Sequence, residues 1–374
     1  MLSRLRLRHF RNYTSLDIDL GKGVTLLCGG NGQGKTSILE AVHYLSVLRS
    51  FRTRKTNDLK QWGSRFFFTE GLFSKNSATP GPSRIGISYA DRRRLRVDGN
   101  VVNRAVDFIG KFRCIACVPE DIMIVKGGPA ERRRFVDMLL CQHSNNYLAH
   151  LSNYQTALKA RNRMLKEPGR YGRSAFAAYD HVLARHAAPV IKARQIFGQT
   201  FGALLADAGS ALFGGGAKVA CRYSANLGAD YHDTEAAISE QYGCLLKSSF
   251  ERDTMRARTT AGPHLDDYTF TLDDVDVGEF GSEGQCRMMS LALKLTSVDF
   301  LHEEDRTTPL IMLVDDVLGE LDKQRRQLFF DNFEKATQVI VACTEASEDL
   351  CSRACRAYSI KDGTASLVDY DPGE

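Results

Sequence analysis

Two short apolar runs in this chain have the pattern of buried strands, and polar residues follow each of them at once. Val24–Cys28 is apolar and partly β-branched, and Ile38–Leu45, a little further on, carries apolar residues with helical spacing. Leu310–Val314 is a similar apolar run near the end of the chain. Continuous runs of this length are typical of parallel strands that are covered on both faces. The pattern therefore predicts an α/β fold with a mixed or parallel sheet.

Elsewhere the polar and apolar positions alternate with the period of two that marks half-buried antiparallel strands. Leu5–Arg8 and Leu16–Leu20 alternate on either side of Arg11 and Asn12, which predicts a hairpin with these two residues at its turn. Ile85–Gly99 alternates in the same way and ends in an Asp-Gly turn. We therefore expect antiparallel strands in the N-terminal part of the chain beside the parallel ones.

The middle of the chain has a helical pattern, from about residue 129 to about residue 256. Pro189 and Gly214–Gly216 are expected to interrupt its helices, which leaves no heptad repeat long enough for an extended coiled coil. We predict a sheet-containing head in two halves, with a mainly helical second lobe inserted between them. The predicted ranges are 1–128 and 257–374 for the head and 129–256 for the lobe.

A glycine-rich loop joins the first apolar run to its helix. The loop has the form G-x-x-x-x-G-K-[ST], in the strand-loop-helix setting that this phosphate-binding motif requires. Glycines let successive backbone N–H groups point at a polyphosphate, Lys35 reaches the outer phosphates, and the hydroxyl of Thr36 holds Mg²⁺. The alternative is an ordinary glycine-rich turn. The residues predicted to hold ATP here are Gly29, Gly30, Asn31, Gly32, Gln33, Gly34, Lys35, Thr36 and Ser37.

Two carboxylates follow the later apolar run. Asp315 and Asp316 stand at what should be the carboxyl edge of a central strand, where ligands bind in α/β folds. We predict that Asp315 binds Mg²⁺ with Thr36, and that Asp316 and Lys35 are catalytic, with Asp316 positioning the attacking water. The short side chain of Asp316 predicts slow turnover. The alternative is a buried strand that merely ends in a polar turn.

A second anion site is predicted ahead of the acidic strand. Ser282, Gly284 and Gln285 begin a segment with helical spacing, so a hydroxyl and the N–H groups of a helix start are available to a phosphate. In one monomer this site has nothing to bind. We predict that it caps the γ-phosphate in the P-loop of a second copy, and Gly319–Asp322 has the spacing of a D-loop in such a dimer. An ordinary serine N-cap is the alternative.

These motifs, in this order, resemble the bacterial RecF family of recombination-mediator ATPases, which is related to SMC and ABC-type heads. The resemblance covers most of the chain and implies an ABC/SMC-type P-loop ATPase head whose Arg11 and Asn12 approach the nucleotide. It also implies an ATP-dependent homodimer on double-stranded and gapped DNA, with recombination-mediator partner proteins that help to load recombinase. Further segments that carry the resemblance are His9–Tyr13, Leu39–Ala41, Arg49–Thr53, Pro119–Asp121, Gly128–Asp137 and Ala261–Asp267.

The chain departs from the family pattern at positions that concern charge. Leu265 stands where the family usually has arginine, which removes one possible charge contact. Glu283 places an anion beside the second anion site unless Arg287 offsets it. By analogy, Thr344 takes the γ-phosphate-sensing position after the last strand, and the region near Glu120 stands in for the Q-loop.

Composition limits these hypotheses. Hydrophobic residues make up 43% of the 374 positions, so a large core is expected, and a net charge of +5 is too small to indicate DNA binding by itself. Local clusters must supply any DNA surface, and the candidates are Arg52–Lys55, Arg92–Arg96 and Arg132–Arg134. We find no signal peptide and no apolar run long enough to span a bilayer, and therefore expect a cytoplasmic protein without a membrane partner.

Ten cysteines in a chain of this length do not make a disulfide scaffold. Most fall within apolar runs, as Cys28 and Cys343 do, and are expected to be free thiols. Cys114 and Cys117 have the spacing of half a zinc site, but they lie in a strand-like run and no histidine spacing supports the metal. The sequence therefore favours buried thiols over zinc.

Three hypotheses of different classes remain. In the first, ATP closes a dimeric clamp on DNA and hydrolysis resets it. In the second, the head is a P-loop small-molecule kinase or another metabolic enzyme that uses Asp316 as a base, which leaves Ser282 and Gln285 without a purpose. In the third, the nucleotide is a dimerisation cofactor with negligible turnover. Dimerisation that depends on ATP and reverses on hydrolysis distinguishes the first from the other two.

Overall fold

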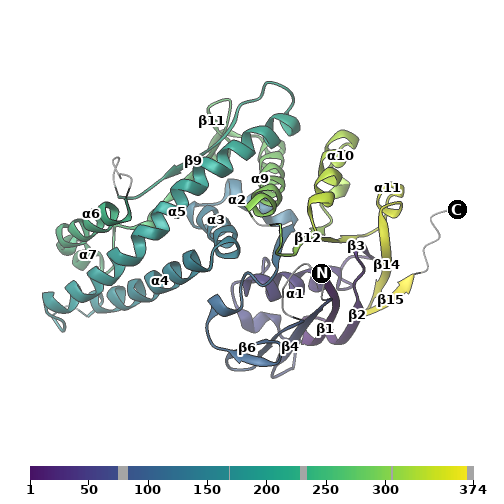
Figure 1. The fold of residues 1–374 in the computed structure, drawn as a ribbon, viewed down its shortest axis with the longest axis horizontal. Coiled ribbons are helices and arrows are strands. Elements are labelled where there is room, and N and C mark those ends of the chain that lie inside the picture. The colour runs from purple at the N-terminus through teal and green to yellow at the C-terminus, as the bar shows by residue number, and fades with distance from the viewer. Residues whose placement is uncertain (75–82, 168, 228–233, 305, 369–374) are drawn as a thin grey trace. The chain divides into compact units, whose positions relative to one another are not determined.

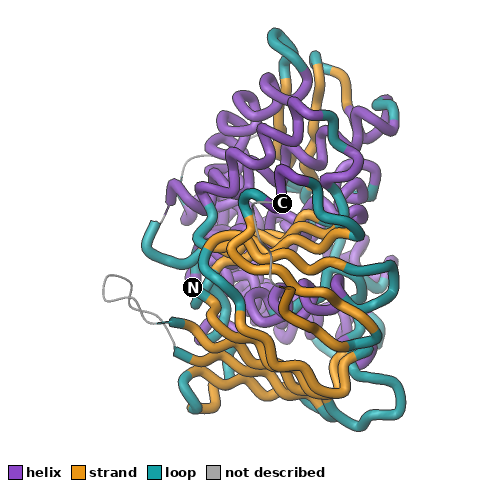
Figure 2. The backbone as a smooth tube through the Cα atoms, turned by 90° about the vertical axis from the view of Figure 1, so that its right-hand side faces the viewer, coloured by secondary structure: helices purple, strands orange, loops and turns teal. Residues whose placement is uncertain are grey.

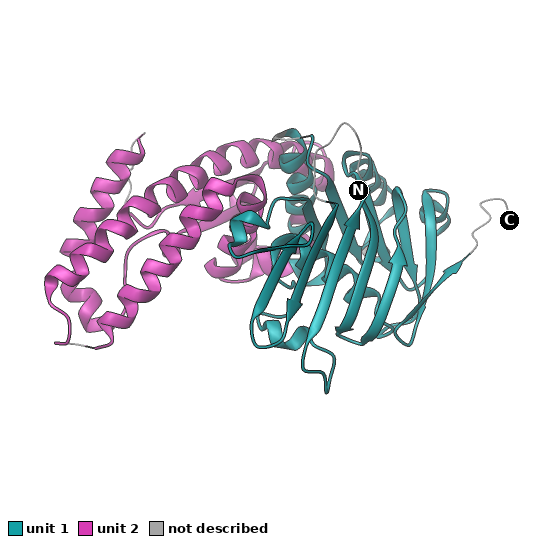
Figure 3. Ribbon diagram, turned by 60° about the horizontal axis from the view of Figure 1, so that its bottom comes forward, with its two compact units in different colours: residues 1–121, 290–374 teal, residues 122–289 magenta. Residues whose placement is uncertain are grey.

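The computed structural model describes residues 1–74, 83–167, 169–227, 234–304 and 306–368 (Figure 1). Its contacts divide the chain into unit 1, residues 1–121 and 290–374, and unit 2, residues 122–289 (Figure 3). The predicted boundaries at 128 and 256 differ from this division, most of all for residues 257–289. These residues fall in unit 2, where β10 (Asp267–Leu272) pairs with β9 (Val219–Ser224) of the inserted segment.

The central sheet of unit 1 has the strand order β15-β14-β3-β13-β12-β8. The strands from β14 to β8 run parallel, which confirms the predicted parallel sheet. The apolar runs of β3 (Gly23–Cys28) and β12 (Leu310–Asp315) are buried in it. The other strands of this sheet are β8 (Arg113–Cys117), β13 (Gln338–Cys343), β14 (Ala354–Lys361) and β15 (Thr364–Val368).

A second sheet of unit 1 is antiparallel, with the order β2-β1-β4-β5-β6-β7, and its strands are among those drawn in orange in Figure 2. Its alternation is the predicted one: Leu5 and Leu7 are buried, whereas Arg6 between them pairs with Asp17 at 3.2 Å. The helix α1 (Lys35–Val47) contacts strands of both sheets, so it lies between them. The strands are β1 (Leu2–Phe10), β2 (Tyr13–Asp19), β4 (Phe67–Phe73), β5 (Arg84–Tyr89), β6 (Arg93–Val97) and β7 (Asn100–Val102).

Unit 2 is mainly helical, and its longest helix corrects one prediction. The helix α5 (Arg173–Phe213) continues through Pro189, where the sequence predicted a break. Pro189 removes one backbone hydrogen bond, but the residues after it, Val190 and Ile191, are fully buried, and packing along α5 holds the helix together. The helix ends at Gly214, as predicted, in a backbone conformation with φ of 102°.

The remaining elements of unit 2 surround α5. A small antiparallel sheet, β11-β10-β9, was not predicted, because its strands lie on either side of the helices α6 and α7 in the sequence. The core joins Leu183, Ala187 and Ile191 of α5 to Ile238 and Tyr242 of α6. The elements are α2 (Ile122–Lys126), α3 (Pro129–His143), α4 (Asn145–Leu165), α6 (Glu235–Ser248), α7 (Phe250–Arg256), β11 (Val275–Asp276) and α8 (Val277–Phe280).

The helix α9 (Glu283–Glu304) begins in unit 2 and ends in unit 1, where α10 (Lys323–Asp331) and α11 (Glu348–Cys351) also lie. Among the described residues, only α5 is long and apolar enough by length and composition to cross a membrane. A core helix meets the same criterion, and Leu183, Ala187 and Ile191 of α5 lie in the packed core of unit 2.

Candidate functional site

The P-loop connects β3 to α1, and two of its glycines are required by close contacts. Gly29 has a φ of 152°, and a Cβ there would lie 2.3 Å from the carbonyl oxygen of Ile360. Gly34 has a φ of 117°, and a Cβ there would lie 2.6 Å from the hydroxyl of Tyr13. Both conformations are rare for residues with side chains. Glycine is therefore required at these two positions by the packing around the loop, whether or not a ligand is bound.

Two hairpin turns hold the P-loop in place. From the β1–β2 turn, Asn12 donates to the carbonyl of Gln33 at 3.1 Å, and the adjacent Tyr13 hydroxyl donates to the carbonyl of Gly34 at 3.2 Å. From the β14–β15 turn, the backbone N–H of Asp362 donates to the side-chain oxygen of Gln33 at 2.7 Å. Asn12 thus reaches the predicted loop and supports it through the backbone.

Lys35 is turned toward the backbone of its own loop. Its ammonium donates to the carbonyl oxygens of Gly29 at 2.6 Å and Gly30 at 2.8 Å, and the residue is almost fully buried. The first turn of α1 begins at Lys35, so its N–H groups point into the loop and favour an anion there. Of the other predicted loop residues, Asn31 and Gly32 are exposed and Ser37 is buried.

Thr36 and Asp315 meet, as predicted for a magnesium pair. The Thr36 hydroxyl donates to a carboxylate oxygen of Asp315 at 3.1 Å, which joins the start of α1 to the end of β12. Burial raises the pKa of the Asp315 carboxyl, and the hydrogen bond from Thr36 works against that rise. One hydroxyl and one carboxylate fit Mg²⁺, which binds few protein ligands and completes its shell with phosphate and water.

Asp316 lies at the same sheet edge with its side chain exposed. Its backbone has a φ of 55°, which is uncommon for a residue other than glycine, and its N–H donates to the carbonyl of Ala342 at 3.1 Å. Strained backbone held by a neighbouring strand is typical of functional positions. The negative charge of Asp316 is one reason why the pKa of Asp315 is raised.

Glu120 follows β8, the strand beside β12, and stands at the same edge. Its charge also raises the pKa of Asp315, so the two residues are electrostatic neighbours. The next residue, Asp121, pairs with Lys294 at 2.7 Å, and Lys294 also donates to the carbonyl of Ala116. The region that the sequence assigned loosely to a Q-loop therefore contributes a third acidic side chain beside Asp315 and Asp316.

The guanidinium of Arg11 points at α1, a contact that the sequence analysis did not predict. It donates to both carboxylate oxygens of Glu40, at 2.7 and 2.6 Å, and to the carbonyl of Asp58. Glu40 is fully buried and also accepts from the hydroxyl of Ser50. A glutamate inside an otherwise apolar helical run was the available signal, because a buried carboxylate needs a partner.

The predicted second anion site lies in unit 2, at the start of α9. The hydroxyl of Ser282 accepts from the N–H of Gln285 at 3.2 Å, and the side chain of Gln285 accepts from the N–H of Ser282 at 2.8 Å. This reciprocal pair is a capping box. Both residues, and Gly284 with them, are exposed. Arg287 pairs with Glu283 at 3.0 Å and lowers the pKa of its carboxyl, as the sequence suggested.

Two other features weighed in the sequence analysis are His264 and the pair Cys114 and Cys117, and the cysteines lie in a buried strand, as predicted. His264, in the family segment Ala261–Asp267, is bonded to the hydroxyl of Tyr154 at 2.6 Å and lies in unit 2, where burial lowers its pKa. Cys114 and Cys117 are buried in β8, and burial raises the pKa of both thiols. Within the described ranges, no group of three or more histidine, cysteine or carboxylate side chains is arranged to hold a metal.

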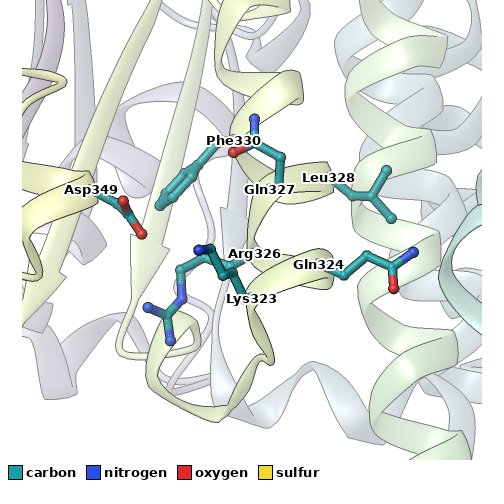
Figure 4. Close-up of a pocket in the computed structure, with 7 residues that line it drawn as sticks. All are labelled: Lys323, Gln324, Arg326, Gln327, Leu328, Phe330 and Asp349. Carbon is teal, nitrogen blue, oxygen red and sulfur yellow. The ribbon is translucent and has the colours of Figure 1, made fainter.

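A hollow of about 530 Å³ lies along α10, just after the predicted D-loop (Figure 4). Its lining mixes basic and apolar side chains, and none of the residues predicted to bind ATP belongs to it. It is therefore separate from the predicted nucleotide site. The lining residues are Lys323, Gln324, Arg326, Gln327, Leu328, Phe330 and Asp349.

Comparison with known proteins agrees with this geometry. Residues 4–97 match the family described as AAA domain. The chain is 33% identical over 350 residues to the DNA replication and repair protein RecF of Pediococcus pentosaceus, covering 92% of both chains. It is 30% identical over 370 residues to the protein of the same name from Macrococcus caseolyticus, covering 98% of this chain and 99% of the other.

A solved structure has the same fold. It is described as the recombination mediator protein RecF with ATP in the RecFOR pathway, and it is 27% identical. The two structures superpose with a TM-score of 0.89 over 98% of this chain and 97% of the other. These relatives do not support the small-molecule kinase hypothesis. With its P-loop, its acidic strand end and nearly full-length similarity to these proteins, the chain belongs to the RecF family of DNA replication and repair proteins.

Proposed function

We propose that this chain is an ATP-dependent DNA-binding ATPase of replication and recombinational repair. The observation that carries the proposal is the hydrogen bond between Thr36 and Asp315, beside a P-loop that two hairpins hold in position. That arrangement offers a hydroxyl–carboxylate pair for a metal, a lysine and the N-terminus of a helix to one triphosphate. Thr36 and Asp315 would hold Mg²⁺, which would supply positive charge to the triphosphate.

Lys35 and Asp316 have separate roles: Lys35 binds phosphate and Asp316 acts on the attacking water. Lys35 exchanges its bonds to Gly29 and Gly30 for bonds to the outer phosphates. Asp316, fixed at its strained position by the bond to Ala342, orients the attacking water and accepts its proton. One carboxylate with a short reach predicts slow hydrolysis, so the ATP-bound state is long-lived.

We further infer that ATP joins two copies of the chain. Ser282, Gly284 and Gln285 are exposed, and their helix start favours an anion in addition to Glu283, the acidic side chain of its first turn. The γ-phosphate in the P-loop of a second copy is that anion. The salt bridge between Glu283 and Arg287 removes most of the repulsion that Glu283 would otherwise exert on it.

The DNA partner is proposed to be double-stranded and gapped, and a surface of unit 1 suits it. The segment between α1 and β4 carries the exposed cations Arg52, Lys55 and Arg65. It also carries Trp62, the one tryptophan of the chain, which is 99% exposed, and Phe66, which is 43% exposed. Cations bind phosphate without reading sequence, and exposed aromatic rings stack on unpaired bases. Recombination-mediator proteins in the cytoplasm complete the proposed set of partners.

Sedimentation of the wild type and of Asp316→Asn tests the ATPase and the dimer together. Asparagine tolerates a positive φ, so this substitution removes the charge and keeps the backbone. We expect the wild type to dimerise with ATP and to return to monomer as ATP is split, whereas Asp316→Asn stays dimeric. A variant that remains monomeric in saturating ATP would contradict the proposed dimer.

The single tryptophan gives a direct test of the DNA surface. Gapped DNA should quench the fluorescence of Trp62, and reversing the charge of Lys55 and Arg65 should weaken binding. If each cation contacts one phosphate, the double reversal makes the negative slope of log affinity against log salt less steep by about 1.8. The same reversal at Arg92 and Arg94, which are also exposed, is the matched control. A larger effect at the control pair would move the DNA surface to β6 and its preceding turn.

A further inference from the structure

Two thiols meet at the base of the P-loop. Cys28 is the last residue of β3 and Cys343 the last residue of β13, and the two are paired in register in the parallel sheet. Their sulfur atoms lie 3.7 Å apart, and both thiols are free. Gly29, the first residue of the P-loop, follows Cys28 directly. The pair is therefore attached to the segment whose shape sets nucleotide binding.

The two thiols differ in a way that suits them to successive chemical steps. Cys28 is partly exposed, whereas Cys343 is buried. The hydrogen bond from Cys343 and the nearby charge of Lys35 lower the pKa of Cys28 to about 7, although burial opposes them. The same hydrogen bond, with Cys343 as the donor, raises the pKa of Cys343, and burial raises it further. Cys28 is thus the accessible thiolate that attacks an oxidant, and Cys343 is a thiol held within reach to resolve the product.

The surroundings of the pair connect it to ATP. A disulfide has a sulfur–sulfur distance of about 2.05 Å, so the two sulfurs must approach by roughly 1.6 Å. Gly29 has little space in which to move, because a Cβ added to it would lie 2.3 Å from the carbonyl oxygen of Ile360. The carbonyl of Gly29 is also a hydrogen-bond acceptor of Lys35. A crosslink at Cys28 therefore disturbs the loop and the lysine that bind the triphosphate.

We propose that Cys28 and Cys343 form a reversible disulfide when the protein meets a peroxide, and that this crosslink closes the P-loop to ATP. The Cys28 thiolate attacks one peroxide oxygen, the O–O bond breaks, and hydroxide leaves, giving a sulfenic acid. Cys343 then attacks the Cys28 sulfur, the S–O bond breaks, and its proton leaves with the oxygen as water. Two thiols are oxidised and one hydrogen peroxide is reduced to two waters. Disulfides inside cells are usually transient and sensory, which fits a reversible device.

The effect on ATP rests on the proposed function, whereas the crosslink itself does not. The experiment uses the full chain with the two exposed thiols, Cys244 and Cys355, replaced by serine so that they cannot react. The protein is treated with hydrogen peroxide, digested and mapped for a peptide linked through Cys28 and Cys343. Affinity for ATP is then measured by calorimetry before oxidation, after oxidation and after dithiothreitol. The comparison variants are Cys28→Ser and, because the site is buried, Cys343→Ala.

The expected result is a mapped Cys28–Cys343 link, at least a tenfold loss of ATP affinity, and full recovery on reduction. Neither comparison variant should form the link or show the recoverable loss. By linkage, a tenfold loss of affinity on oxidation requires saturating ATP, which binds the reduced form more tightly, to raise the midpoint potential of the pair by about 30 mV. No mapped link, or a link that leaves ATP affinity unchanged, would overturn the proposal. Failure of the reduced protein to bind ATP would instead contradict the proposed function.

Discussion

The P-loop and the start of α9 are both glycine-containing helix starts that suit an anion, yet the chain treats them differently. The P-loop is held by contacts from two separate hairpins, through Asn12 and Tyr13 of one and Asp362 of the other. At the start of α9, the side chains of Ser282 and Gln285 each accept from the backbone N–H of the other, and both residues remain exposed. The P-loop is thus held in position entirely by contacts within one chain. The start of α9 is only capped, which suits a surface that is completed by another molecule.

Two arginine–glutamate pairs show the same difference in energetic terms. Glu40 is fully buried, and Arg11 donates to both of its carboxylate oxygens while Ser50 donates to one, so loss of Arg11 removes the close charge partner of a buried carboxylate. Glu283 and Arg287 form their pair on the exposed face of α9, where water replaces either partner easily. Rigidity is thus concentrated around the P-loop, and the helix start is left free to adjust.

The largest expected effect is on stability, from Arg11→Ala. Removing this partner of a buried carboxylate should lower the free energy of unfolding by about 3–5 kcal/mol. Arg287→Ala, at the exposed pair, should leave it nearly unchanged, because water screens that pair. Urea denaturation measures both. Equal losses in the two variants would show that the contrast between the regions is not one of stability.

The next effect is on nucleotide binding, from Lys35→Ala. Charge-assisted hydrogen bonds are worth about 1.5–3 kcal/mol, so ATP affinity should fall roughly 10- to 100-fold. Lys22→Ala, at an exposed lysine of the same unit, is the control and should bind ATP normally. Calorimetry with MgATP provides the measurement. Retained affinity in Lys35→Ala would remove the P-loop from the proposed site.

A smaller and more selective effect is expected from Ser282→Arg. The monomer should keep its ATP affinity, because the P-loop is complete without α9, whereas ATP-dependent dimerisation should disappear. Loss of the N-cap should lower stability by about 1 kcal/mol. Thr234→Arg removes the exposed cap of α6 in the same unit, so it matches that loss and should dimerise normally. Light scattering with and without ATP measures dimerisation of both variants. Dimerisation by Ser282→Arg would refute the role assigned to this serine.

The smallest change in stability is expected from Asp315→Asn. This substitution should stabilise the fold but weaken ATP binding. Burial raises the pKa of Asp315 above its usual 3.8, so the folded state binds the proton more tightly than the unfolded state. The stability of the wild type therefore falls as pH rises through the raised pKa. Asparagine has no charge to bury and should gain about 0.5–1 kcal/mol at neutral pH while losing Mg²⁺-dependent ATP binding. Thermal unfolding at pH 4 and pH 7 measures the difference, which should vanish at the lower pH.

Local patterns were sufficient for much of this molecule. The strand, glycine loop and helix around Gly29–Ser37 follow from apolar spacing, and the Thr36–Asp315 contact follows from the rule that parallel strands present their carboxyl ends at one edge. The β1–β2 hairpin follows from the alternation of apolar and polar residues in Leu5–Arg8 and Leu16–Leu20. In these cases the pattern that predicts an element lies within the element itself.

Other features depend on partners far away in the sequence. Pro189 is a local helix breaker, but packing along α5 outweighs it. Strand β9 was missed because its pairing partner, β10, follows two intervening helices. The contact of Arg11 with Glu40 and the approach of Cys28 to Cys343 both require knowledge of which elements become neighbours. No periodicity within either segment contains that information.

The strand order of the central sheet has a consequence for how the protein is made. β3 leads into the P-loop early in the chain, but both of its neighbours, β13 and β14, and the supporting Asp362 come from the C-terminal end. Residues up to the β14–β15 turn must therefore be made before the cradle for the triphosphate can take shape. A fragment that ends before β13 lacks both neighbours of β3, and we expect it not to bind ATP.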